Sequence, residues 1–182
     1  LMVAVQLSAQ STDKGVNRIT EKLFKKYRTL EDYVNVDSRE FERDIFASGF
    51  YRNKARNILG AAKMLKEEFG GVLPRTIGEM LSLPGVARKT ATVVLKEAYG
   101  VVAGITVDTH VIRFAQRYGL SDYKDAVRIE RDLMELLPRK EWGTFTHRVI
   151  HYGRYMAPAR RYDTSKDPLV SIYPPAAGRF RA

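Results

Sequence analysis

The sequence predicts an all-α protein folded as two helical lobes. Apolar residues recur at the three- and four-residue spacing of an amphipathic helix along most of the 182 residues, and no run alternates between apolar and polar residues as a strand would. N-capping residues and glycines stand where this spacing starts and stops. We expect residues 1–102 to form one lobe and residues 103–182 to form the other.

Six helices are predicted in the first lobe. In the second of them, Val16, Ile19 and Leu23 have helical spacing, and Asp13 is the expected N-cap. The fourth is long and is expected to end at the pair of glycines that follows Phe69. The expected helices span residues 1–9, 14–27, 38–48, 52–69, 76–82 and 88–99.

Three helices are predicted in the second lobe. The first spans residues 108–118, with Asp108 as its opening residue and Gly119 after its end. The other two span residues 125–137 and 141–156. Beyond Ala157 the chain has four prolines and no apolar period, so this tail is expected to be loop or extended chain.

The composition favours a polyanionic partner. The formal net charge is +10, which suggests nucleic acid first and an anionic membrane surface second, although a basic, merely soluble protein would look the same. No cysteine is present, which excludes disulfides, thiol catalysis and thiolate metal sites. No apolar run is long enough to span a membrane, and residues 1–7 lack the marks of a signal peptide. Because the chain opens inside an apolar helix, we expect it to be part of a longer one.

A turn between two predicted helices indicates a phosphate-binding hairpin. Residues 83–90 read Leu-Pro-Gly-Val-Ala-Arg-Lys-Thr. Gly85 permits a tight turn, and the N–H groups at the start of the next helix could then bind a phosphate without contacting bases. An ordinary corner between two helices is the alternative, and the cations Arg88 and Lys89 favour the phosphate site.

Lys89 and Asp108 are candidate reactive groups. Lys89 lies in the first turn of a predicted helix, where the helix dipole disfavours a cation, which favours a neutral amine that can attack a sugar carbon. Asp108 could stabilise positive charge that develops on the sugar or help to deprotonate the amine. Taken alone, each residue has a plainer interpretation, as a surface lysine and as a helix N-cap.

Several motifs in order carry a resemblance to a known family. Residues 83–90 and the Val-Asp-Thr-His of residues 107–110 resemble the helix-hairpin-helix (HhH-GPD) DNA glycosylases, and endonuclease III most closely. The Leu-Ser-Ala-Gln-Ser-Thr-Asp of residues 7–13, the Gly-Phe-Tyr-Arg-Asn-Lys-Ala of residues 49–55 and the Gly-Arg-Tyr of residues 153–155 continue it. The resemblance covers residues 1 to about 157.

The resemblance implies a role for each matching residue. Lys89 falls on the lysine that attacks the sugar, and Asp108 on its paired aspartate. Gln10 falls on the residue that fills the gap left by an extruded base, and Phe50 on a wedge that enters the opposite strand. Without the resemblance, Gln10 would be a helix-end polar residue and Phe50 a core aromatic. The other expected DNA contacts are Tyr51, Gly85, Ala87, Arg88 and His110.

The resemblance also implies an activity. We expect a base-excision-repair enzyme that is both a DNA N-glycosylase and an abasic-site lyase, with its active site in the cleft between the lobes. The expected substrate is double-stranded DNA with an abasic site or a damaged base, an oxidised pyrimidine first. The protein is expected to act as a monomer in the cytoplasm, associated with the nucleoid, if it is prokaryotic.

The chain departs from the family in four places. Ala87 replaces a hairpin glycine, and one extra residue separates Lys89 from Asp108. The family normally has an N-terminal segment before the position of Leu1, and we expect this sequence to lack it. The four cysteines that hold an iron–sulfur cluster are also missing, so we expect no cofactor. We expect no metal either, because His147 and His151 have a ligand-like spacing without an evident third ligand.

Three other functions are compatible with parts of the sequence. A monofunctional mismatch glycosylase would have serine or tyrosine in place of Lys89, and an adenine-specific one would need a glutamate within residues 1–10, which contain none. A non-catalytic DNA-binding module would not need both Lys89 and Asp108. A basic scaffold for a protein partner would show no salt-sensitive DNA binding.

Overall fold

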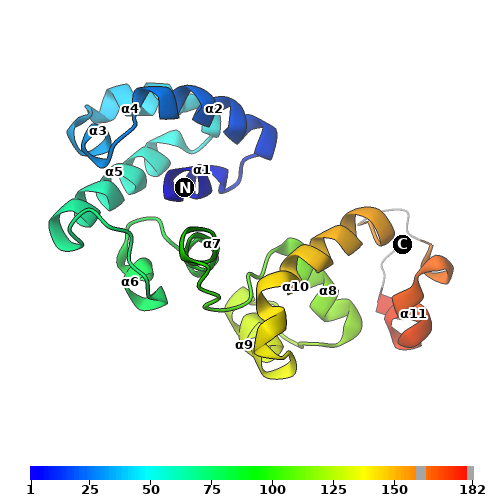
Figure 1. Cartoon of the computed structure of the whole chain (residues 1–182). Helices are drawn as coiled ribbons and strands as arrows, with labels where there is room; N and C mark the ends of the chain where they lie inside the picture. Colours follow the sequence, from blue (N-terminus) through cyan, green and yellow to red (C-terminus); the bar gives the residue numbers. More distant parts are fainter. Residues whose placement is uncertain (159–162, 180–182) are drawn as a thin grey trace. The chain divides into compact units, whose positions relative to one another are not determined.

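The structure, a computed structural model, describes residues 1–158 and 163–179 (Figure 1). Within these ranges the chain forms helices and no strand, which confirms the predicted all-α class. The chain divides into two compact units, Leu1–Val101 and Val102–Ala182. Each unit is described by itself.

Unit 1 contains seven α-helices and one 3₁₀ turn among its described residues. Four helices begin at a Thr or Asp whose side chain accepts a backbone N–H, at Thr12, Thr29, Asp37 and Thr76. The predicted cap Asp13 is therefore wrong by one residue. The elements are α1 (Met2–Ser8), α2 (Asp13–Lys26), α3 (Leu30–Asn35), α4 (Ser38–Asp44), the 3₁₀ turn Phe46–Ser48, α5 (Tyr51–Glu68), α6 (Ile77–Ser82) and α7 (Arg88–Tyr99).

The helix α3 was not predicted from the sequence. Its N-terminus is a capping box, in which the Thr29 side chain accepts the Asp32 N–H and the Asp32 carboxylate accepts the Thr29 N–H. Tyr33 anchors the helix because its ring is buried in the core of unit 1. The capping box and the packing of Tyr33, Leu30 and Val34 against the core therefore support this short helix.

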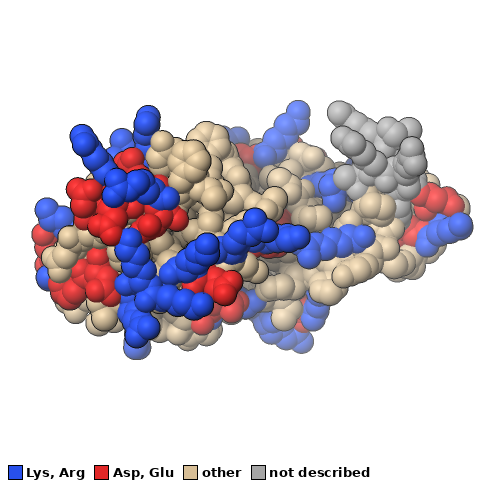
Figure 2. All heavy atoms as spheres, turned by 90° about the horizontal axis from the view of Figure 1, so that it is seen from above, with Lys and Arg blue, Asp and Glu red and all other residues tan. Residues whose placement is uncertain are grey.

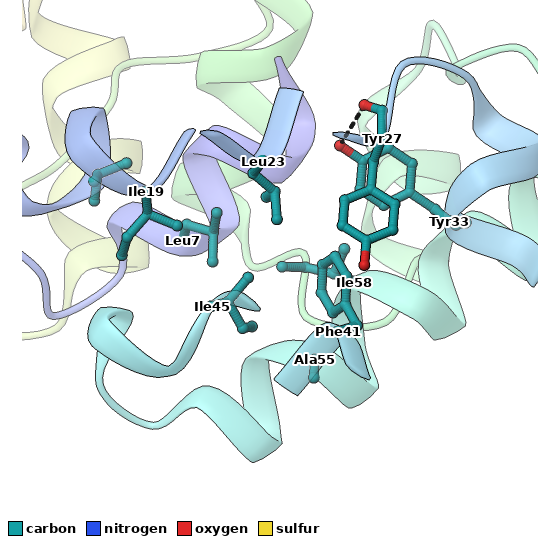
Figure 3. Close-up of a cluster of buried hydrophobic side chains, with 11 residues drawn as sticks. Leu7, Ile19, Leu23, Tyr27, Tyr33, Phe41, Ile45, Ala55 and Ile58 are labelled. Atoms are coloured by element: carbon teal, nitrogen blue, oxygen red, sulfur yellow. Dashed lines mark hydrogen bonds between the residues drawn. The ribbon is translucent and has the colours of Figure 1, made fainter. Parts of the chain in front are cut away.

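The core of unit 1 lies where α1 to α5 meet. Figure 3 shows Tyr27, Tyr33 and Phe41 packed against one another, with ring centroids 5.4 to 5.9 Å apart. Leu7 and Ile58 extend the same cluster and are fully buried. Burial of such side chains is worth about 1.5–3 kcal/mol each, so this cluster fixes how α1 and α5 pack.

Unit 2 is built on a second apolar cluster. Ile105, Val111, Ala115, Ile129 and Leu133 are fully or almost fully buried, and Trp142 and Phe145 pack against them. The elements are α8 (Thr109–Tyr118), α9 (Ala126–Leu136), α10 (Arg139–His151), a π-helical turn (Tyr152–Met156), a 3₁₀ turn (Thr164–Lys166), α11 (Pro168–Ile172) and a second 3₁₀ turn (Pro174–Arg179). The predicted helix 141–156 thus changes to π geometry after His151.

The prediction of loop or extended chain beyond Ala157 is wrong for residues 164–179. Asp163 accepts the Ser165 N–H at 3.0 Å, and Asp167 accepts the Leu169 N–H at 2.8 Å. Pro168 stands at the first position of α11, where its missing N–H costs nothing. Local caps therefore create short helices without an apolar period. Residues 159–162 of this prediction lie outside the described residues.

In the part of the chain that the structure describes, none of the helices has both the length and the apolar character needed to cross a bilayer.

Candidate functional site

The hairpin of residues 83–90 joins α6 to α7. Leu83 and Val86 are buried and anchor the two sides of the turn, and the Val86 N–H donates to the Leu83 carbonyl at 3.1 Å. Gly85 is exposed at the tip with φ of +71°, which a residue with a side chain adopts only at a cost. Its neighbourhood is also tight, because Asn57 of α5 lies directly beside it.

Lys89 is the second residue of α7 and is exposed. The N-cap before it is Ala87, whose methyl group cannot accept an N–H of the first turn. Ala87 has φ of −82°, so alanine fits where relatives of the resembled family have glycine. The start of α7 therefore combines an exposed amine with backbone N–H groups that no N-cap side chain covers.

Asp108 is the N-cap of α8. Its Oδ1 accepts the N–H groups of His110 and Val111, both at 2.9 Å. The carboxylate is half-buried, and it follows the buried Ile105 and Val107. A capping carboxylate is rigidly placed. Asp108 thus has the plain capping role, and its second oxygen, Oδ2, takes no part in the cap.

His110 lies in the first turn of α8 and is half-buried. Its Nδ1 lies 3.2 Å from an Arg113 Nη. Gly153 packs against the same ring: a Cβ at Gly153 would lie 2.6 Å from His110 Nδ1. The Gly-Arg-Tyr motif of residues 153–155 therefore supplies the space that the His110 side chain occupies.

Gln10 and Phe50 share an unusual backbone conformation. Among the described residues other than glycine, these two have positive φ, 54° for Gln10 and 47° for Phe50. Both side chains are exposed, Phe50 by 70% of its surface. This exposure excludes the alternative of a core role for Phe50. Residues whose backbone is held in such a sparsely populated conformation are more frequent at functional sites.

Tyr51 differs from Phe50 in its surroundings. It is half-buried, packs against the core of unit 1 and has its ring centroid 4.9 Å from that of Phe46. The Arg52 guanidinium carbon lies over the Tyr51 ring, 5.5 Å from its centroid. Tyr51 thus has a packing role, whatever it contacts outside the chain.

A cavity of about 390 Å³ in unit 1 brings several predicted residues together. It lies against α1, α5 and the hairpin. The lining residues are Gln6, Ala9, Gln10, Phe50, Asn53, Lys54, Asn57 and Gly85. Gln10, Phe50 and Gly85 were predicted from separate motifs. All three line the same cavity.

Four polar residues of this cavity were missed from the sequence: Gln6, Asn53, Lys54 and Asn57. Gln6 is buried, its Nε2 donates to the Pro84 carbonyl at 2.8 Å, and its Oε1 has no partner among the described residues. Asn57 lies beside Gly85, and Lys54 is a buried cation. One sequence signal could have identified Gln6: the apolar periodicity of α1 places this polar residue on the buried face of the helix.

The chain carries 31 Lys and Arg against 21 Asp and Glu. On the face drawn in Figure 2, basic side chains (blue) project from both units, and groups of acidic side chains (red) lie next to some of them. This distribution suits a polyanionic ligand.

The donor set does not fit an iron–sulfur cluster. The 182 residues contain no cysteine, so the chain supplies no thiolate. Among the residues that the structure describes, no three of His, Asp and Glu gather as metal ligands would, and His147 and His151 remain a pair.

Comparison with known proteins identifies the family. Residues 3–139 match the family described as HhH-GPD superfamily base excision DNA repair protein. The chain is 47% identical to endonuclease III of Synechocystis sp. over 176 residues, which are 97% of this chain and 80% of that protein. It is 47% identical to endonuclease III of Bacillus subtilis over 173 residues, which are 94% of this chain and 78% of that protein.

A solved structure has the same fold. It is described as a trapped endonuclease III–DNA covalent intermediate in an estranged-adenine complex. Its sequence is 44% identical to this chain, and the TM-score is 0.89. The match covers 99% of this chain and 84% of that one. The chain therefore belongs to the HhH-GPD superfamily of base excision DNA repair proteins and, within it, to the endonuclease III family. It is a base excision repair enzyme, a DNA glycosylase with an associated abasic-site lyase activity.

Proposed function

We propose that Lys89 is the nucleophile of this glycosylase. Its Nζ attacks C1′ of the damaged nucleotide, and the bond from C1′ to the base breaks, so that the base leaves with its electron pair and takes up a proton. Loss of the ring oxygen from C1′ then gives a Schiff base between Lys89 and the opened sugar. Loss of a C2′ proton and cleavage of the C3′–O bond nick the strand. The observation that carries the proposal is the exposed amine of Lys89 in the first turn of the hairpin's second helix.

The proposed partner of Lys89 is Asp108. Its Oδ1 is engaged in capping α8, and Oδ2 is available to face positive charge that develops on the sugar or to accept a proton from the amine. Lys89 belongs to unit 1 and Asp108 to unit 2. The proposal therefore requires both groups to act on the same damaged nucleotide.

The proposed role of Gln10 and Phe50 is to hold an extruded nucleotide out of the helix. Chemistry at C1′ requires the nucleotide to leave the base stack, which costs a few kcal/mol unless another group fills the gap. Gln10 would fill the gap, and Phe50 would enter beside the opposite base. Their exposure and their place at the rim of one cavity support this role.

The remaining contacts are proposed to bind the DNA backbone. Gly85, Ala87 and Arg88 present the start of α7 to a phosphate, and His110 presents a ring nitrogen from the start of α8. Tyr51 supports the loop that carries Phe50. We propose that the protein acts as a monomer on duplex DNA of the nucleoid, with an oxidised pyrimidine as its damaged base and without a metal or other cofactor.

Borohydride trapping tests the proposal. The parent and Lys89→Gln are incubated with duplex DNA that carries either an abasic site or thymine glycol, in the presence of borohydride. We expect a covalent protein–DNA adduct with the parent and none with the variant, because only a Schiff base is reduced to a stable link. A folded parent that binds this DNA but gives no adduct would contradict Lys89 as a nucleophile and favour a monofunctional glycosylase.

A further inference from the structure

Lys54 is a buried cation in the first turn of α5. Only 8% of its surface is exposed, and burying an ammonium is costly unless its N–H groups are bonded. Its Nζ lies 2.8 Å from each of three oxygens, Leu7 O, Ser11 Oγ and Ser48 O. An ammonium has three N–H groups, so each oxygen receives one. Burial lowers the pKa of Lys54, and the three acceptors oppose that effect because only the charged form satisfies them all.

The three acceptors come from the two loops that carry Gln10 and Phe50. Leu7 O and Ser11 Oγ lie on either side of Gln10, at the end of α1. Ser48 O lies two residues before Phe50. The loops are also joined directly, because Ser11 Oγ donates to Ser48 O at 2.6 Å. Lys54 therefore ties together two segments that lie about forty residues apart in the sequence.

Both loops need such support. Positive φ is costly for residues with a side chain, and it persists where the surroundings over-determine the backbone. Gln10 and Phe50 have this conformation, and neither side chain is held by burial, since both are exposed. The Lys54 backbone N–H donates to the Phe50 carbonyl at 3.0 Å, which is the first backbone bond of α5. The Lys54 side chain is therefore anchored at the start of the helix that follows Phe50.

We propose that Lys54 is a positioning residue that holds the loops of Gln10 and Phe50 in one arrangement, so that both side chains enter the DNA together. The inference rests on the proposed roles of Gln10 and Phe50 in nucleotide extrusion. Lys54 does not itself touch the reacting atoms in this proposal. Its effect is confined to the step in which a stacked nucleotide leaves the duplex.

The variant Lys54→Met tests this step, because methionine has a similar length and no N–H group. Lys63→Met is the matched control, since Lys63 lies on the same helix and is exposed. Two reactions are compared: single-turnover excision of thymine glycol from duplex DNA, and borohydride trapping on a single-stranded abasic oligonucleotide, which needs no extrusion. For Lys54→Met we expect excision to fall about ten- to a hundredfold and trapping to stay within about twofold of the parent. We expect Lys63→Met to match the parent in both.

A second variant removes the direct hydrogen bond between the two loops and changes a smaller side chain than Lys54→Met does. Ser11→Ala deletes the Oγ that bonds both Lys54 and Ser48. We expect it to slow duplex excision by about five- to thirtyfold, the effect of two hydrogen bonds, again without a change in single-strand trapping. This variant keeps the test valid if Lys54→Met does not fold.

A double-mutant cycle gives the final test. If Lys54 acts through Gln10 and Phe50, Lys54→Met adds no further loss of duplex excision to the Gln10→Ala/Phe50→Ala variant. The inference would be overturned if Lys54→Met reduced excision by its full factor in the Gln10→Ala/Phe50→Ala background as well. It would also be overturned if folded Lys54→Met alone excised at the parent rate, or lost excision and trapping equally. A parent that cannot be trapped at all would instead contradict the proposed nucleophile, so the two failures are distinguishable.

Discussion

Asn57 fills the space beside Gly85, so that a Cβ added to Gly85 would lie 2.6 Å from the Asn57 Cβ. Positive φ adds a second penalty, and together they predict the effect of Gly85→Ala. We expect a loss of about 1–3 kcal/mol in the free energy of unfolding. We also expect weaker binding of undamaged duplex DNA, because the N–H groups of the turn shift. Urea unfolding and fluorescence anisotropy measure the two effects.

Gly78 is the control for that variant. It lies in α6, and a Cβ there would meet no atom within 4 Å. Gly78→Ala is expected to raise stability by about 0.5–1 kcal/mol, since alanine is the better helix former. If Gly85→Ala and Gly78→Ala behaved alike, the hairpin would not depend on glycine at its tip.

Asp108→Asn separates the capping role of Asp108 from its charge. Asparagine caps helices as well as aspartate does, so its side-chain oxygen can accept the same N–H groups of His110 and Val111. We expect unchanged thermal stability and a fall of about 10²- to 10³-fold in single-turnover excision, because a preorganised charge at the sugar is lost.

Asp108→Ala is the comparison that reveals the cap itself. It removes both functions, and we expect it to lose about 1 kcal/mol of stability in addition to the activity. Parent-like excision by Asp108→Asn would show that Asp108 is only an N-cap and would remove it from the proposed mechanism.

The helices were predictable where their signals are local. Thr76 and Asp108 cap the helices that they were expected to open, and the apolar period of α5 set its extent to within one residue. The helix α3 was missed because six residues carry too little periodicity. Its capping box, Thr29 with Asp32, was a sequence signal that could have found it.

The supports of the site were not predictable, because they depend on contacts between distant residues. Lys54 accounts for the positions of Gln10 and Phe50, and two of its partners are 47 and 43 residues away in the chain. Nothing in the residues around Lys54 marks it as buried. The exposure of Phe50 was expected from the family resemblance alone, since an aromatic after a glycine is more often part of a core.

A buried carboxylate holds the tail that follows the Gly-Arg-Tyr motif. Asp167 is 2% exposed, and its Oδ2 lies within hydrogen-bond distance of the hydroxyl groups of Tyr118 and Tyr152, whose oxygens lie 2.6 Å from each other. The two hydroxyl protons are shared among these three contacts. Its other oxygen caps α11 through the Leu169 N–H. Asp167 thus ties α8, the π turn and α11 together.

We expect Asp167→Ala to lower the stability of unit 2 by about 2–4 kcal/mol, the sum of a lost cap and of a half-buried tyrosine hydroxyl that loses its carboxylate acceptor. Amide hydrogen exchange in residues 164–172 measures the effect locally. Asp163→Ala is the control, because Asp163 is exposed and caps only a short turn, and it is expected to cost about 1 kcal/mol or less. Equal exchange rates in the two variants would show that the tail is held by other contacts.

The tyrosines of the unit 1 core predict a loss of stability at high pH. Burial raises the pKa of Tyr27 to about 12, helped by the hydrogen bond from its hydroxyl to Asp44, and burial raises the pKa of Tyr33 to about 12 as well. The ordinary value of about 10 applies in the unfolded chain. Because the folded pKa is raised, the contribution of each neutral hydroxyl to stability is fully present below about pH 10 and is lost as the pH rises through about 12.

The urea midpoint of the parent should therefore fall across this window. It should fall less in Tyr33→Phe than in Tyr123→Phe, which replaces an exposed tyrosine. Phenolate absorbance recorded on the same samples shows whether two tyrosines ionise only as unit 1 unfolds. A parent midpoint that stays constant across the window, or two core tyrosines that ionise in the folded protein with the exposed ones, would contradict this account of the core.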